Sequence, residues 1–120
     1  MYADLLLDHF EHPRNVGEMV DADAEAEVEN PVCGDRLHLW LKLDHDVIRA
    51  ARWRADGCVP AIAAASAMSE LIQGLRAEDA LALEGDRIAA AIGGVPERKA
   101  HALILAQTAV RRALRDRNPR

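Results

Sequence analysis

The chain has 120 residues, half of them hydrophobic but only 3% aromatic, and its formal net charge is −5. This length fits one domain, residues 1–120, with a core of small and branched aliphatic side chains. The negative charge disfavours general binding to nucleic acids, which requires Lys and Arg to neutralise phosphates. No apolar run approaches the length of a membrane span, and the first residues lack the pattern of a secretory signal. We therefore expect a cytoplasmic protein with reduced thiols and no membrane partner.

The first half of the chain predicts one helix followed by strands. Leu5, Leu6 and Phe10 fall near one helical face, and Pro13 ends this pattern. Strict alternation of apolar and polar residues is typical of half-buried strands, and the short "DHD" between two alternating runs predicts a hairpin turn. The alternating runs are residues 24–29, 37–44 and 51–55. They predict a small antiparallel sheet with one face covered.

The second half changes to the helical period. Pro60 stands at the first position of a predicted helix that ends before Gly74. The stretch "EDALALEGDRIAAAIGG" predicts one or two short helices, and a final helix is expected from about Glu97 to Asp116. The stretch "AHALILAQTAV" is apolar nearly all round, so we expect the first half of that helix to be buried. Strands first and helices afterwards predict an α+β fold, a three-stranded antiparallel sheet packed against several helices.

Four residues at the ends of these elements carry metal-binding groups. If the chain is extended from Cys33 to Leu37, the side chains of Cys33 and Asp35 point the same way. Cys58 precedes a helix start, where free N–H groups and the helix dipole favour a thiolate. His101 falls in the first turns of the last helix. Two sulfurs, an oxygen and a nitrogen would suit tetrahedral zinc or an exposed iron–sulfur cluster.

The pattern alone leaves structural roles open for the same residues. The two cysteines do not form a CxxC pair, and a free cysteine is most often a small buried hydrophobe. Asp35 follows a glycine, where an aspartate is most often a turn residue, and His101 taken alone is more often a hydrogen-bonded helix histidine than a ligand. The remaining histidines are expected on exposed faces or turns and receive no role: His9, His12, His38 and His45.

Four motifs in order give the chain a family resemblance. The motifs "DHFEHPRNVG", "PVCGDRLHLWLKL", "ARWRADGCVPAIAAAS" and "RKAHALILAQTAV" resemble the IscU/NifU N-terminal family, which includes a SufU-like branch. These proteins are scaffolds on which iron–sulfur clusters are assembled, not enzymes. The resemblance covers nearly the whole chain and implies that Cys33, Asp35, Cys58 and His101 bind zinc or a [2Fe-2S] cluster. It also implies a cysteine desulfurase as partner.

Two departures from the family pattern stand near the end of the chain. The third family cysteine falls at Ala102, and alanine can neither coordinate a metal nor carry sulfur. The family loop bound by an Hsp70-type chaperone aligns with "VPERK", which makes Pro96 and Lys99 the implied partner-binding residues. A charged pair replaces two apolar residues between them. Because Hsp70 clefts favour apolar extended segments, we do not expect the usual chaperone recognition.

Three functions therefore remain open from the sequence. The leading one is a scaffold or carrier for iron–sulfur cluster assembly. The first alternative is a zinc-dependent sulfur acceptor for a cysteine desulfurase, which needs Cys33 or Cys58 as nucleophile. The second is a module that binds a partner without metal. The helical stretch "AIAAASAM" can pack against the sheet or against another copy of the chain, so a homo-oligomer also remains open.

Overall fold

A three-stranded antiparallel sheet in the order β1-β2-β3 forms one layer of the computed structural model, which describes residues 2–117. The strands are β1 (Ala24–Glu29), β2 (Arg36–Asp44) and β3 (Val47–Asp56). His45 and Asp46 connect β2 to β3 with φ of 51° and 62°. Positive φ at both positions is the signature of a two-residue hairpin turn. The predicted sheet and its "DHD" hairpin are confirmed.

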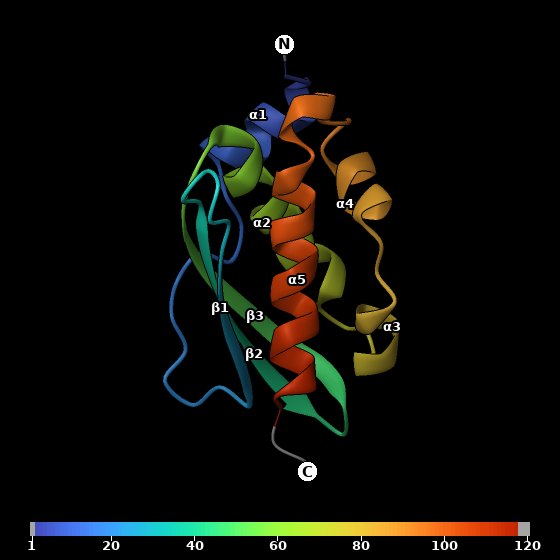
Figure 1. The fold of residues 1–120 in the computed structure, drawn as a ribbon. Coiled ribbons are helices and arrows are strands. Elements are labelled where there is room, and N and C mark those ends of the chain that lie inside the picture. The colour runs from blue at the N-terminus through green and yellow to red at the C-terminus, as the bar shows by residue number, and fades with distance from the viewer. Residues whose placement is uncertain (1, 118–120) are drawn as a thin grey trace.

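Helices cover one face of this sheet (Figure 1). The two central helices, α2 and α5, pack against the strands and against each other, α1 packs on α2, and the short helices α3 and α4 flank α5. Their bounds are α1 (Asp4–Glu11), α2 (Val59–Ile72), α3 (Ala77–Leu81), α4 (Gly85–Ala91), a 3-10 turn η1 (Glu97–Lys99) and α5 (His101–Arg115). The predicted α+β fold is confirmed. Within residues 2–117, no helix combines the length and apolar character needed to cross a membrane.

Alanine allows α2 to lie in the middle of the fold. Its buried residues include Ala63, Ala64, Ala65 and Ala67, each at most 1% exposed. Small side chains let a helix approach its neighbours closely, and alanine is also the best helix former. Pro60 occupies the start of the helix as predicted, where its missing N–H costs no hydrogen bond. The apolar stretch of α2 is thus buried inside the chain, against the sheet and α5.

The last helix differs from the expectation in two ways. α5 begins at His101, and residues Glu97–Lys99 form a 3-10 turn instead. The cause is local, because the N–H groups of Lys99 and Ala100 donate to carbonyls three residues back. The first half of α5 is not wholly buried either, since Ile104 is 61% exposed while Leu105 is 5% exposed. Only one face of the helix meets the sheet.

The N-terminal helix presents a histidine to the core. Leu6 and His9, three residues apart, face inward, whereas Leu5 is 54% exposed. The expectation of an exposed His9 is therefore wrong. Its Nδ1 lies 2.8 Å from Ser66 Oγ of α2, and the Arg14 N–H donates to the same oxygen at 2.9 Å. Hydrogen bonds of this kind make the burial of a polar ring tolerable, and the sequence pattern contains no sign of Ser66 as its partner.

Candidate metal centre

The hairpin and the helix starts bring three potential metal ligands together. Asp35 lies immediately before β2, Cys58 is the N-cap residue of α2, and His101 is the first residue of α5. Because β3 runs antiparallel to β2, the last residue of β3, Asp56, pairs with the first residue of β2, Arg36. The chain leaving β3 therefore passes Asp35 before α2 begins. The start of α5 packs beside both.

The three ligand atoms are spaced like corners of a small tetrahedron. Cys58 Sγ lies 3.5 Å from Asp35 Oδ2 and 3.8 Å from His101 Nε2. His101 Nε2 lies 3.4 Å from Asp35 Oδ2. Ordinary zinc–sulfur, zinc–nitrogen and zinc–oxygen bonds at tetrahedral angles would separate such ligand atoms by about 3.4–3.6 Å. Three corners of the polyhedron are thus formed before any ion enters.

Burial sets the protonation of the thiol at this centre. It raises the pKa of Cys58, and a hydrogen bond with the backbone of Ala61 in the first turn of α2 acts against it. The negative charge of Asp35 raises the pKa of this thiol further, both through space and by hydrogen bonding. The net shift is upward, so the expectation that the helix start makes Cys58 a thiolate is wrong for the metal-free chain. A metal ion must displace the proton to bind the sulfur.

Cys33, the fourth predicted ligand, is not part of this group of three. It lies in the turn before β2 with its side chain exposed, whereas Asp35 is 6% exposed. Two backbone hydrogen bonds close the turn: Asn30 N–H donates to the Asp35 carbonyl at 2.8 Å, and Gly34 N–H donates to the Asn30 carbonyl at 2.7 Å. Gly34 has φ of 77°. A left-handed residue interrupts the alternation of an extended chain, so the prediction that Cys33 and Asp35 share a face is wrong.

Gly57 is a site residue that the sequence reasoning missed. A Cβ on Gly57 would lie 3.0 Å from Asp35 Cγ and 3.1 Å from its Oδ1, closer than nine in ten Cβ contacts. Its backbone has no unusual φ, so the requirement for glycine comes from close approach alone. The Gly-Cys pair in the sequence was a signal, because a glycine beside a ligand allows backbone to pack against the site.

The predicted partner-binding residues flank the same end of α5. Pro96 precedes η1 as its N-cap residue and Lys99 ends it, and both side chains are half-buried. The charge of Lys99 acts to lower the pKa of Cys58, so this ammonium group lies close enough to influence the metal centre. Ala102 follows His101 and is fully buried. It leaves the centre without the third thiol of the family pattern.

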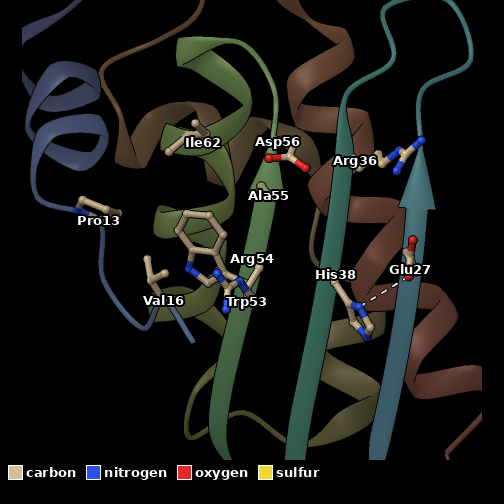
Figure 2. A pocket seen from close by; sticks show the side chains of 10 residues that line it. All are labelled: Pro13, Val16, Glu27, Arg36, His38, Trp53, Arg54, Ala55, Asp56 and Ile62. Carbon is tan, nitrogen blue, oxygen red and sulfur yellow. Dashed lines mark ion pairs between the residues drawn. The ribbon is translucent and has the colours of Figure 1, made fainter. Parts of the chain in front are cut away.

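Two surface hollows lie near this region, and only one of them reaches the metal centre. The first, of about 450 Å³, lies at the edge of β3 between the N-terminal segment and the outer face of the sheet (Figure 2). It contains none of the three ligands. The second, of about 320 Å³, lies between the end of β1 and α5, and His101 is part of its wall.

These observations define a class of protein: a small α+β chain whose sheet and helices present a carboxylate, a thiol and an imidazole at three element ends. A family model described as "NifU-like N terminal domain" matches residues 1–120. The chain belongs to this family. The predicted resemblance is confirmed, and with it the expectation of an IscU-like fold.

Similar proteins agree with this assignment. The chain is 42% identical over 116 residues to "Iron-sulfur cluster assembly scaffold protein IscU 1" of Archaeoglobus fulgidus, which covers 97% of this chain and 76% of the relative. It is 36% identical over 117 residues to the IscU scaffold protein of Aquifex aeolicus, covering 96% of this chain and 74% of that one. A crystal structure of a NifU-like protein from Brucella abortus superposes with a TM-score of 0.79 at 22% identity, covering 93% of this chain and 90% of that chain. This last likeness concerns the fold.

Proposed function

We propose that this chain is a scaffold for iron–sulfur cluster assembly that holds zinc at Asp35, Cys58 and His101, or a labile [2Fe-2S] cluster at these residues together with Cys33. The observation that carries the proposal is the spacing of the three ligand atoms, 3.4–3.8 Å apart at a half-open site. Membership of the NifU-like family and the scaffold function named for the relatives from Archaeoglobus and Aquifex support it.

The donor set fits zinc as it stands. Zinc accepts thiolate, imidazole and carboxylate ligands in one tetrahedron, and its fourth position can be taken by water or an incoming ligand. Iron in clusters prefers thiolate ligands. For the cluster as cargo, Cys33 is the remaining thiol of the chain. Its side chain is exposed in the turn before β2, which two backbone hydrogen bonds at Asn30 hold.

One observation favours a second function, that of a zinc-dependent sulfur acceptor. Three candidate zinc ligands lie together without Cys33, whose side chain is exposed. An exposed thiol beside a metal centre is accessible to a persulfide carried by a cysteine desulfurase. Cys33 would attack the outer sulfur of that persulfide, and the desulfurase cysteine would leave as a thiolate. Either function makes a cysteine desulfurase the expected partner.

The loop before α5 is the segment that the family resemblance implies as the binding site of an Hsp70-type chaperone. Glu97 and Arg98 are exposed charged residues between the half-buried Pro96 and Lys99. We infer that an Hsp70-type chaperone does not recognise this loop in the way implied for the family, because its cleft favours apolar side chains. A peptide with the sequence of residues 94–100 should fail to compete for such a chaperone, whereas a variant peptide with both charged residues replaced by Pro-Val should compete.

Metal analysis tests the proposed function directly. Protein purified aerobically should contain about one zinc per chain, as a single tetrahedral site requires. Anaerobic purification or reconstitution should add iron with acid-labile sulfide if the scaffold function holds. Cys33→Ser should retain the zinc but lose the cluster and sulfur acceptance. Absence of zinc and iron under both conditions would contradict the proposal and favour a module that binds partners without metal.

A further inference from the structure

The two edge strands of the sheet, β3 and β1, differ in whether other segments of the chain hydrogen-bond to their outer edges. β3 is covered along its outer edge by two chain segments: Trp53 exchanges backbone hydrogen bonds with Asn15 and Gly17, and Ile48 with Gly74 and Leu75. β1 is the opposite edge. No segment within residues 2–117 has a backbone hydrogen bond to its outer side. Figure 2 shows β1 as the outermost strand, with α5 behind it.

The register shows which backbone groups this open edge presents. Asn30 N–H donates to the Asp35 carbonyl in line with the β1–β2 ladder, so the hydrogen-bonded pairs continue to Val28↔Leu37, Ala26↔Leu39 and Ala24↔Leu41. The residues between them direct N–H and C=O away from β2. Those residues are Glu25, Glu27 and Glu29. A second chain can therefore add to β1 through three consecutive hydrogen-bonding positions.

The inner face beside this edge is hollowed and mainly apolar. β1 presents Ala24, Ala26 and Val28 to the core side, and two of these three side chains are small. The groove of about 320 Å³ follows between β1 and α5. Its walls include Val28, Pro31, Ile104, Leu105 and Thr108, with His101 at the metal centre. Ile104 is 61% exposed here, so an apolar side chain entering the groove would cover it.

The outer face at the same edge is acidic. Glu25, Glu27 and Glu29 are exposed. The residues paired with them on β2 are Trp40, His38 and Arg36, of which Arg36 alone carries a permanent positive charge, 3.5 Å from Glu29. His38 lies between the carboxylates of Glu25 and Glu27, at 2.6 and 3.4 Å. Directly opposite side chains on paired strands interact strongly, and like charges repel. A second β1 would place Glu against Glu, so pairing between two copies of the chain is disfavoured.

We propose that β1 and the groove beside α5 bind an extended segment of a partner protein in which basic residues alternate with apolar residues. The segment adds as a fourth strand. Its basic side chains lie on the outer face opposite the three glutamates, and its apolar side chains enter the groove against Val28 and Ile104. The strand passes His101, so binding brings the partner beside the metal centre without requiring bound metal.

Amide hydrogen exchange followed by NMR tests the pairing at the level of single residues. In the metal-free chain, the amides of Glu25, Glu27 and Glu29 should exchange faster than those of Ala26 and Val28, which donate to β2. The probe is an end-capped synthetic peptide in which lysine and valine alternate, matched to the 6 residues of β1. Its addition should slow exchange at the three glutamate amides and leave Ala26 and Val28 unchanged. Unchanged exchange at the glutamates would overturn the proposal.

A matched peptide separates strand pairing from simple charge attraction. The same sequence with N-methyl groups on the amides that face β1 keeps every side chain and charge, but loses the backbone hydrogen bonds. It should bind about tenfold more weakly or worse. Equal affinity of the two peptides would mean that charge attraction alone, without strand pairing, causes the binding, and would overturn the proposal.

Variants of the chain complete the test. Glu27→Lys reverses the central charge and should weaken binding of the lysine–valine peptide, whereas Glu11→Lys, on exposed α1, should not. Ile104→Asp should weaken binding through the groove. Zinc content of the same variants reports separately on the proposed function, because none of these side chains belongs to the three-ligand group. Equal binding by all variants would contradict the assigned surface.

Discussion

His9 and His101 each lie in a polar cluster made from segments far apart in the sequence, and the two clusters differ in how their polar atoms are used. His9 is 6% exposed and bonded to Ser66, whose oxygen also accepts the N–H of Arg14. His101 faces a thiol and a carboxylate, each within 3.8 Å of its Nε2, at a half-open position. Hydrogen bonds closed inside the core stabilise a fold, whereas ligand atoms converging near the surface leave a place for a metal ion. We therefore expect the first cluster to contribute to stability and the second to the proposed metal binding.

The largest expected effect is the loss of metal on Cys58→Ala. The substitution removes the sulfur corner of the three-ligand group. Zinc affinity should fall by at least about a hundredfold, because replacing residues that only support the metal ligands already costs about 10–100-fold. Competition with a chromophoric zinc chelator measures this. Ser66→Ala is the matched control in the other cluster and should bind zinc like the parent chain. An unchanged zinc affinity in Cys58→Ala would remove the metal assignment.

A smaller loss of affinity is expected for Gly57→Ala. The added Cβ would lie 3.0 Å from Asp35 Cγ, so the carboxylate must move away from its present position. Displacing one ligand without removing it should weaken zinc binding by about 10–100-fold. Gly85→Ala serves as control, because its Cβ would meet only Leu103 Cβ at an ordinary 3.5 Å. If both variants bind zinc equally well, close packing against Asp35 does not position that ligand.

Ser66→Ala should affect stability and leave the metal centre intact. The hydroxyl oxygen lies 2.8 Å from His9 Nδ1 and accepts the Arg14 N–H at 2.9 Å. Its removal leaves these groups without that partner, which should lower the free energy of unfolding by about 1–3 kcal/mol. Urea denaturation measures the change, with Cys58→Ala as the variant from the other cluster. A free energy equal to that of the parent chain would mean that the His9 cluster contributes nothing to the fold.

The pH dependence of stability gives the smallest effect. Burial lowers the pKa of His9 from its ordinary value of 6.5, and Arg14 adds to this lowering, while Glu70 and Asp8 oppose it. Below that ordinary value the unfolded chain binds more protons than the folded chain, so stability falls as the pH drops toward the folded pKa of His9. The slope for one group cannot exceed about 1.4 kcal/mol per pH unit. Urea midpoints over this range measure it.

The control for the pH experiment is His9→Gln. Glutamine keeps a hydrogen-bonding group but does not titrate, so the part of the slope that comes from His9 should disappear. If this variant keeps the full slope, groups other than His9 cause the pH dependence of stability. Zinc-free protein must be used, because protons and metal compete for Cys58 and would add a second pH dependence.

Local periodicity predicted much of the fold. The alternation in residues 24–29, 37–44 and 51–55 predicted the sheet, and Pro60 marked the start of α2. The errors came where side-chain partners decide the local structure. Nothing in the sequence of α1 shows that His9 has Ser66 as its partner. The 3-10 turn before α5 differs from an α-helix only because each N–H donates to the carbonyl three residues back instead of four.

The sequence by itself determined the kinds of element and the identities of the candidate ligands, because periodicity and residue chemistry are local properties. Only the tertiary structure decided which ligands meet. It brings Asp35, Cys58 and His101 within 4.8 Å of one another and leaves Cys33 outside, because Gly34 turns the backbone between the first cysteine and the aspartate. Among residues 2–117, segments distant in the sequence supply backbone partners to the outer edge of β3 and none to the outer edge of β1.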